Sequence, residues 1–185
     1  MKKAALGFGL LLAFAPVFAY AESPTPKEAT DIPKSDIDEV LKHAPPAVDQ
    51  TLRVVDLGKY NLAVGVIHRG PTKPGEPVGG ISHSDTTETY IIISGGGTLV
   101  TGGTIVNGKP APPNSDVVKV LNGPSTGGRI ENGLSRKVGP GDVIIIPFGV
   151  PHGWTDITDH VDYLSVRPDH NHVLPAGYVN PAIKK

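Results

Sequence analysis

The sequence lacks cysteine altogether, and among its 185 residues it has one tryptophan, one methionine and only 5% aromatic side chains. Without thiols the chain can form no disulfide, perform no thiolate catalysis and offer no sulfur ligand to a metal ion. It also lacks an excess of charge, since the formal net charge is −1 and the lysines and arginines are scattered. This balance argues against electrostatic capture of nucleic acid or of an acidic membrane surface.

Long hydrophobic runs are absent beyond the N-terminus, where one apolar stretch covers residues 6–18. Two lysines precede it, and Ala19-Tyr20-Ala21 follows with small residues at the two positions that a signal peptidase reads. We therefore expect a signal peptide over residues 1–21, cut after Ala21, and a periplasmic or secreted protein without membrane contact after cleavage. An uncleaved anchor is the alternative, but the apolar run is short for crossing a bilayer.

Residues 22–50 predict a proline-rich leader followed by a short helix. Prolines among charged residues favour an extended, poorly ordered chain from Glu22 to Lys34. Ser35 is a suitable N-cap for a helix over 36–43, which Ala44-Pro45-Pro46 would end. The apolar residues of this helix form one stripe that can pack against the outside of a sheet.

From Thr51 onward the sequence predicts short strands separated by turns. Gly 23 and Pro 19 are well above average usage, which fits many strands joined by tight turns. The expected strands are 52–56, 62–68, 88–94, 98–106, 117–121, 129–136, 143–146, 152–156 and 161–166. Strands at this spacing indicate a sandwich or a small barrel. We assign residues 51–168 to this β domain and expect an irregular tail over 169–185 across its outside.

The most informative strand is Val143–Ile146, a run of aliphatic residues opened by Gly141-Asp142. A short apolar run bounded by turn residues predicts a buried strand. Pro147 cannot donate to a strand ladder and Gly149 permits unusual backbone angles, so the strand must end there. His152 then lies at the mouth of a β body, where its side chain can face a cavity.

Two stretches of this chain resemble the paired motifs of the cupin superfamily. The first reads Gly75, five residues, Ile81-Ser82-His83, four residues, Glu88, six residues, Gly95. The second reads Gly141, five residues, Pro147-Phe148-Gly149, two residues, His152, three residues, Asp156. Two fixed positions depart from the family pattern, because Ile81 replaces the first histidine and Asp156 replaces a terminal asparagine. The resemblance implies an all-β fold, a cupin-like antiparallel jelly-roll barrel with the short N-terminal helix outside it, and it is compatible with a homodimer.

The two motifs also supply a set of metal ligands. His83 and Glu88 are an odd number of residues apart, and the turn-like Ser84–Thr87 between them lets both face one interior. With His152 they offer two neutral imidazoles and one carboxylate, a set that suits an open site for a divalent transition metal (Fe, Mn, Zn, Co or Ni). In the family that the motifs resemble, the ion is typically held by three histidines and one glutamate. Ile81 therefore removes one ligand, which either opens a position for substrate or weakens the site until no metal binds.

Period-two counting places further side chains on the same interior face. The residues expected to line the pocket are Ile81, Tyr90, Ile92, Trp154 and Asp156, of which Tyr90 and Asp156 are the candidate catalytic groups. Asp85, His68, His170 and His172 are weaker candidates, each favoured as a structural or solvent-exposed residue rather than a ligand. Ser94–Gly97 predicts a tight hairpin rather than a phosphate loop, because no helix follows it.

These observations support a periplasmic metal-dependent cupin enzyme that acts on a small organic molecule, by oxygenase or by isomerase or lyase chemistry. The alternative is a small-ligand-binding cupin without turnover, in which Ile81 marks the loss of full metal coordination. A partner-binding domain that uses the proline-rich leader has little support. The fold does not choose among these functions, because one fold supports many of them.

Overall fold

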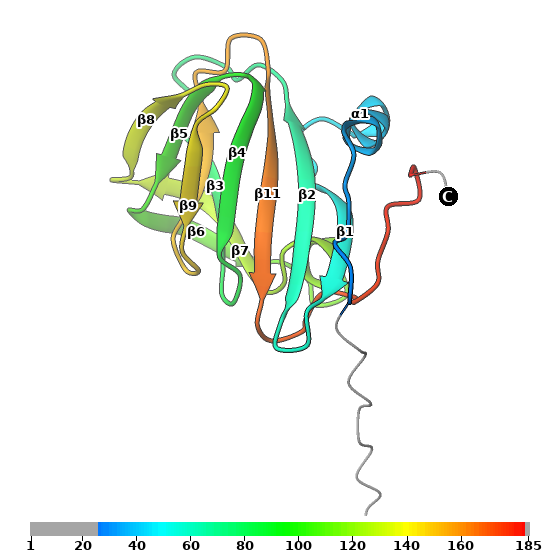
Figure 1. Cartoon of the computed structure of the whole chain (residues 1–185). Helices are drawn as coiled ribbons and strands as arrows, with labels where there is room; N and C mark the ends of the chain where they lie inside the picture. Colours follow the sequence, from blue (N-terminus) through cyan, green and yellow to red (C-terminus); the bar gives the residue numbers. More distant parts are fainter. Residues whose placement is uncertain (1–25, 184–185) are drawn as a thin grey trace, which may run out of the picture.

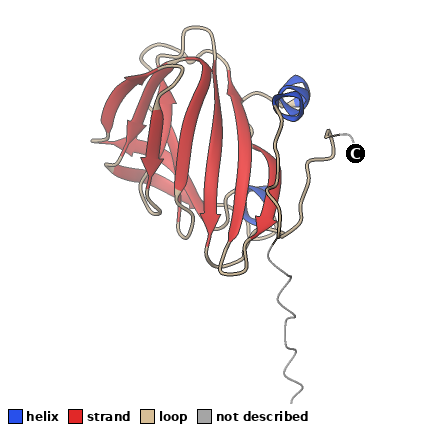
Figure 2. Ribbon diagram, in the orientation of Figure 1, coloured by secondary structure: helices blue, strands red, loops and turns tan. Residues whose placement is uncertain are grey.

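The computed structural model describes residues 26–183, so the expected signal peptide lies outside the described part of the chain. Strands make up most of its regular structure, as Figure 2 shows. Among the described residues, no helix is long and apolar enough to cross a membrane.

The strands of the described chain form two antiparallel sheets (Figure 1). The order β1-β2-β11-β4-β9 forms the five-stranded sheet, with β1 Gln50–Asp56, β2 Asn61–Arg69, β4 Glu88–Gly95, β9 Val143–Ile146 and β11 Val161–Asp169. The order β6-β7-β3-β10-β5-β8 forms the six-stranded sheet, with β3 Gly79–His83, β5 Gly97–Thr101, β6 Thr104–Pro110, β7 Ser125–Glu131, β8 Leu134–Val138 and β10 His152–Thr155. Apart from β1-β2 and β6-β7, neighbouring strands in each sheet are not consecutive in sequence, as in a jelly roll. The expected antiparallel jelly-roll fold is confirmed.

Apolar and aromatic side chains of both sheets form the main core. It contains Leu99 and Trp154 from the six-stranded sheet and Ile67, Ile92 and Tyr163 from the five-stranded sheet. Ile92 is therefore a core residue, and neither of the hollows beside the site described below includes it in its lining.

The side chains on the inward face of β11 change from apolar to polar along the strand. Burial alternates strictly, so that Val161, Tyr163, Ser165, Arg167 and Asp169 are all buried. The first two belong to the apolar core, and the last three are polar. A buried arginine and aspartate need partners inside the protein, and for Arg167 these partners form part of the site described below.

The helix α1 (Lys34–His43) packs on the outer face of the five-stranded sheet beside β1 and β2 (Figure 1). Its Val40 meets Leu52, Val66 and Ile183 in a second apolar cluster. The expected stripe thus packs as the sequence indicates, but Ser35 is not the N-cap. The helix begins at Lys34, because the carbonyl of Pro33 already accepts the N–H of Asp36 at 2.9 Å.

Positive backbone φ angles divide two of the expected strands. The strand expected over 98–106 is split into β5 and β6 at Gly102 and Gly103, whose φ angles are 77° and 72°. The strand expected over 129–136 is split into β7 and β8 at Asn132, with a φ of 57°. An extended chain cannot continue through such angles, so the chain bends there, and the two strands on either side of each bend take non-neighbouring places in the six-stranded sheet.

Other local predictions were also wrong. Val117–Leu121 forms one π-helical turn rather than a strand, because the carbonyl of Val117 accepts the N–H of Asn122, five residues on, at 2.8 Å. Ser94–Gly97 does not close a hairpin, since β4 and β5 belong to different sheets. β3 was not predicted, and β11 continues to Asp169 rather than ending at the expected Val166.

Candidate metal centre

His83 and Glu88 come from opposite sheets and meet between them. His83 ends β3 in the six-stranded sheet, and Glu88 opens β4 in the five-stranded sheet. The intervening turn carries the chain across the barrel, as the spacing predicts. His83 Nε2 lies 3.2 Å from Glu88 Oε2.

His152 opens β10, next to β3, and the loop before it is tied to His83. Gly149 adopts a φ of 75° and donates its N–H to the carbonyl of His83 at 2.7 Å. This contact sets the approach of the chain to His152, whose Nε2 lies 3.0 Å from Glu88 Oε2. All three side chains are buried, and one ligand atom of each lies within 4.8 Å of the others.

The hydrogen bonds at the far side of each imidazole determine which nitrogen carries the proton. His152 Nδ1 lies 3.0 Å from the carbonyl of Val150, which can only accept, so Nδ1 carries the hydrogen. Ser125 Oγ donates to the carbonyl of Gly123, so it accepts from His83 Nδ1 at 2.7 Å. In the neutral form of each ring, Nε2 therefore keeps a free lone pair.

These two lone pairs point toward Glu88, and they have no hydrogen-bond partner. His83 Nε2 and His152 Nε2 are buried polar atoms without a hydrogen-bond donor or acceptor among the described residues. Two lone pairs at about 3 Å from a carboxylate oxygen repel it unless a cation lies between them. The donor set and the unpartnered nitrogens fit a divalent transition ion.

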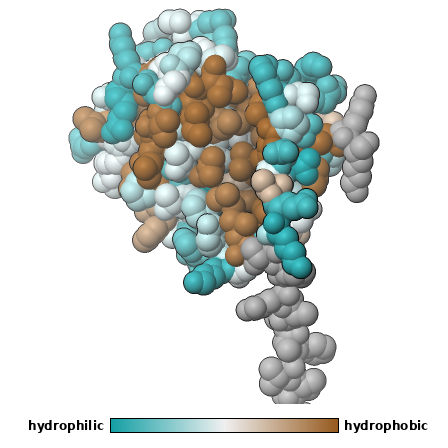
Figure 3. Space-filling model, in the orientation of Figure 1, coloured by the Kyte–Doolittle hydropathy of each residue, from teal (hydrophilic) through white to brown (hydrophobic). Residues whose placement is uncertain are grey.

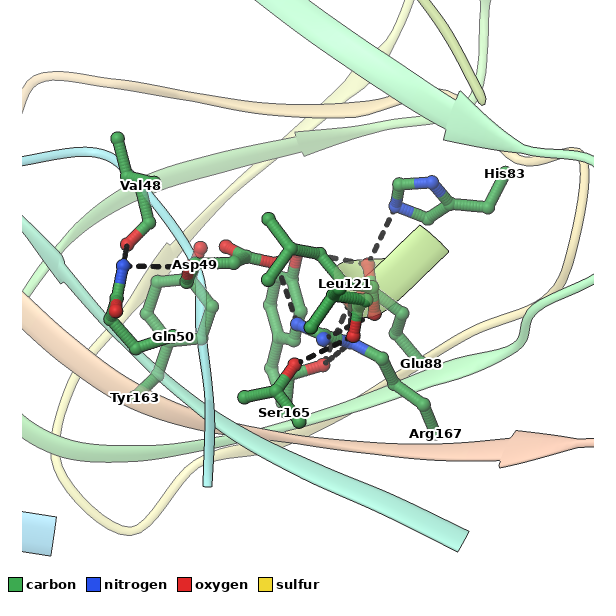
Figure 4. Close-up of polar contacts among 12 residues, drawn as sticks. Val48, Asp49, Gln50, His83, Glu88, Leu121, Tyr163, Ser165 and Arg167 are labelled. Carbon is green, nitrogen blue, oxygen red and sulfur yellow. Dashed lines mark hydrogen bonds and ion pairs between the residues drawn. The ribbon is translucent and has the colours of Figure 1, made fainter. Parts of the chain in front are cut away.

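Glu88 is held from behind by a buried polar network (Figure 4). Its Oε1 accepts from Ser165 Oγ and from Arg167 Nε, both at 2.8 Å. Arg167 in turn donates from Nη2 to Asp49 at 2.6 Å and from Nη1 to the carbonyl of Leu121 at 2.8 Å. Burial alone would raise the pKa of Glu88, but the charge of Arg167 and the contacts with His152 and His83 together outweigh it and hold that pKa well below the usual range. Glu88 is therefore an anion whose Oε2 is left to bind a metal.

Tyr90 lies beside the ligands and donates its hydroxyl hydrogen to Glu88 Oε2 at 3.1 Å. Burial and the negative charge of Glu88 raise the pKa of Tyr90 well above its ordinary value. Tyr90 thus stays protonated at neutral pH, where it can donate a proton but cannot act as a base.

Two adjoining hollows open next to the ligands. The smaller, of ≈ 200 Å³, is lined by His83, His152, Tyr90 and Ile81 among others. The larger, of ≈ 500 Å³, is lined by His152, Ile81 and Trp154 among others. Ile81, Tyr90 and Trp154 thus lie where period-two counting places them.

Asp156 does not lie with this group. It is exposed, has a φ of 52° and lines a different hollow near Gly95 and His160. β10 ends at Thr155, so the alternation on which the prediction relied no longer applies one residue later. Asp156 is therefore neither a pocket wall nor a catalytic candidate for this site.

The weaker ligand candidates also lie elsewhere. His68 pairs with Asp162 at 2.7 Å and stacks on His160, outside both hollows. His170 and His172 are exposed. Asp85 belongs to no ligand cluster among residues 26–183.

Sequence reasoning missed Ser125, Ser165, Arg167 and a further cavity residue, Arg69. No motif of the sequence includes them, and Arg167 falls just after the point where the last strand was expected to end. Continued period-two counting from Val161 would have placed Ser165 and Arg167 on the inward face.

No protein-family model matches the chain, and no curated protein sequence matches it. Among solved structures, DMSP lyase DddQ from Ruegeria pomeroyi DSS-3 superposes with a TM-score of 0.42 at 16% identity, over 75% of this chain and 53% of that one. A protein with a double-stranded β-helix domain from Klebsiella pneumoniae gives 0.42 at 20% identity, over 71% and 88% of the two chains. A cupin protein from Bacteroides fragilis gives 0.36 at 16% identity, over 67% and 78%. The chain spans about half the length of DddQ, and likeness at this level says nothing about substrate.

The two sequence motifs occupy matching places in the observed barrel. The first runs through β3 and β4, the second runs through β9 and β10, and their histidines and glutamate converge between the two antiparallel sheets. This chain has the cupin fold. Within this fold, Ile81 takes the position of the first motif histidine and forms a wall shared by the two hollows.

Proposed function

We propose that this cupin is a periplasmic metal-dependent enzyme that acts on a small organic molecule, with His83, Glu88 and His152 holding one divalent transition ion. One observation carries the proposal: two buried imidazole lone pairs aim at a buried carboxylate oxygen and have no partner. A structural histidine pair would donate a hydrogen to Glu88, but the Nδ1 contacts to Ser125 and Val150 oppose that arrangement.

The chain's own residues define how such a site would work. Glu88 offers only Oε2, because Ser165 and Arg167 occupy Oε1. Ile81 contributes no ligand atom, so coordination positions remain for substrate on the side of the hollows. A divalent ion of this kind supplies Lewis-acid or redox chemistry, which leaves oxygenase and isomerase or lyase reactions both open. Tyr90, kept protonated, lies in the smaller hollow, where it can donate a proton.

The second candidate is a cupin that binds a small ligand without turnover. Ile81 favours it, because a site with three protein ligands holds an ion less firmly than one with four. A catalytic site needs open positions, so Ile81 by itself is compatible with both candidates.

Metal analysis of the purified chain separates them. We expect about one transition ion per chain in the wild type and loss of the ion in His152→Ala and Glu88→Gln. His170→Ala is the matched control, since His170 is exposed and should leave the metal content unchanged. A wild-type protein that takes up no transition ion from a metal-supplemented buffer contradicts the enzyme proposal.

The periplasmic location is a separate part of the proposal and rests on the N-terminal sequence. We expect the intact mass of the protein from a periplasmic extract to match a chain beginning at Glu22. Recovery of the uncut chain from the cytoplasmic fraction would refute this location without affecting the metal site.

A further inference from the structure

Arg69 is a charged side chain that the proposed metal chemistry does not use. It is the last residue of β2, and it lines both hollows beside the candidate ligands. Ile81, His152 and Ala47 are the other residues common to both linings. The side chain of Arg69 therefore lies where the two hollows meet, within reach of a molecule bound in either of them.

Tyr163 fixes the orientation of this guanidinium. Arg69 Nε donates to the hydroxyl of Tyr163 at 2.8 Å, and its central carbon lies 5.8 Å from the centre of the Tyr163 ring. Nη1 and Nη2 of Arg69 make no hydrogen bond to any residue between 26 and 183, and neither is a buried unpartnered atom. Both terminal nitrogens thus remain accessible in the cavity, on a side chain that is already held in place.

The charges around the site leave Arg69 without a close counter-ion. Glu88 and Asp49 are both paired with Arg167. In the described part of the chain, no carboxylate lies within the 4.0 Å limit of an ion pair with Arg69. The formal charges of Arg69, Arg167, Glu88 and Asp49 sum to zero. A divalent ion would therefore give the region two unbalanced positive charges.

We propose that Arg69 binds the carboxylate of the substrate, so that the enzyme acts on a small organic acid; this inference rests on the proposed function. A guanidinium edge with two free nitrogens matches a carboxylate through two parallel hydrogen bonds. The walls of the larger hollow next to Arg69 include Trp154, Ile157 and Pro71, which suit an apolar body. A phosphate group presents three acceptor oxygens, of which the fork of Arg69 pairs with two.

Matched ligand pairs test the carboxylate directly. Benzoate with benzamide, and butyrate with butyramide, have similar shapes and differ in charge. Their dissociation constants are measured by calorimetry on the purified chain, both stripped of metal by chelation and loaded with Mn²⁺. We expect the wild type to prefer each carboxylate over its amide by roughly 10- to 100-fold, and Arg69→Gln to abolish that preference. Arg69→Lys retains the charge without the planar fork and should keep part of it.

Arg136→Gln is the control for net charge, because Arg136 is exposed and lines neither hollow; it should bind as the wild type does. Equal binding of acid and amide by the wild type overturns the inference, and so does no binding of either carboxylate. Full preference in Arg69→Gln, or tighter binding of inorganic phosphate than of benzoate, also overturns it. The wild-type comparison decides even where Arg69→Gln fails to fold. A chain that takes up no metal but still prefers carboxylates would refute the proposed function while supporting the role of Arg69.

Discussion

Replacement of Arg167 by methionine should strongly destabilise this protein. The Arg167 side chain is 0% exposed and lies between two carboxylates, Glu88 at 2.8 Å and Asp49 at 2.6 Å. Methionine fills much of the same space but removes the charge and all hydrogen bonds of the guanidinium. Glu88, itself 1% exposed, would then be a buried anion without its counter-ion.

The expected cost follows from the loss of that counter-ion. Removing one partner of a buried ion pair typically costs about 3–5 kcal/mol, out of a total stability of roughly 5–15 kcal/mol for a domain. Arg167→Lys keeps the charge but cannot reproduce the fork that reaches Glu88, Leu121 and Asp49 together. We expect it to cost about 1–3 kcal/mol, the range for lost hydrogen bonds to charged groups.

Urea unfolding followed by tryptophan fluorescence measures these changes, because Trp154 is the single tryptophan and belongs to the main core. The pH dependence provides a second check. The pKa of Glu88 is held below its unfolded value of 4.5, despite burial, with the charge of Arg167 as the largest of the lowering causes, so the pair stabilises the protein above that pH. This contribution disappears as the pH falls through the folded-state pKa of Glu88. The difference in the free energy of unfolding between wild type and Arg167→Met should therefore narrow there. A difference in the free energy of unfolding below about 0.5 kcal/mol between wild type and Arg167→Met at neutral pH, within the range of ordinary surface substitutions, would refute the reasoning.

Other expected outcomes concern the ligands and the outer surface. Ser125→Ala removes the acceptor that orients His83 and should weaken metal binding by about 10- to 100-fold, measured by competition with a chelating dye; Ser115→Ala, at a half-buried serine that lines neither hollow, should not. Ile81→His offers a further imidazole beside His152 and should tighten metal binding in the same assay, and unchanged affinity would show that this position does not face the ion. Ile145 on the edge strand β9 is 69% exposed, and Figure 3 shows that apolar side chains gather on the face of the five-stranded sheet. If the homodimer compatible with the cupin resemblance uses this face, Ile145→Lys should yield monomers in light scattering, and a dimer that survives would exclude this face.

The main features of the fold and of the candidate site could be predicted because local chemistry determines them. Gly141 and Pro147 delimit the apolar run of β9 whatever packs around it. The turn between His83 and Glu88 has only polar residues, so the chain had to change direction there. Motif spacing therefore places the histidines and Glu88 on one interior without knowledge of the strand order.

The features that could not be predicted depend on distant partners. Val117–Leu121 has the β-branched residues of a strand, yet it forms a π-helical turn whose Leu121 carbonyl accepts from Arg167. Arg167 itself resembles a surface residue in the sequence, and only the contact with Glu88, on a neighbouring strand, explains its burial. The prediction that Asp156 lines the pocket was wrong for a local reason, because β10 ends at Thr155, one residue before it.

Arg167 also explains how the carboxylate of Glu88, a candidate metal ligand, can stay ionised in this interior. A carboxylate buried beside neutral imidazoles would ordinarily take up a proton, because burial penalises its charge. Arg167 prevents this, and its second carboxylate, Asp49, makes the group of Glu88, Asp49 and Arg167 net negative by one charge. That single negative charge only partly offsets a divalent ion. The remainder, together with the charge of Arg69, must be balanced by an anion from solution, so metal and organic acid should each strengthen the binding of the other.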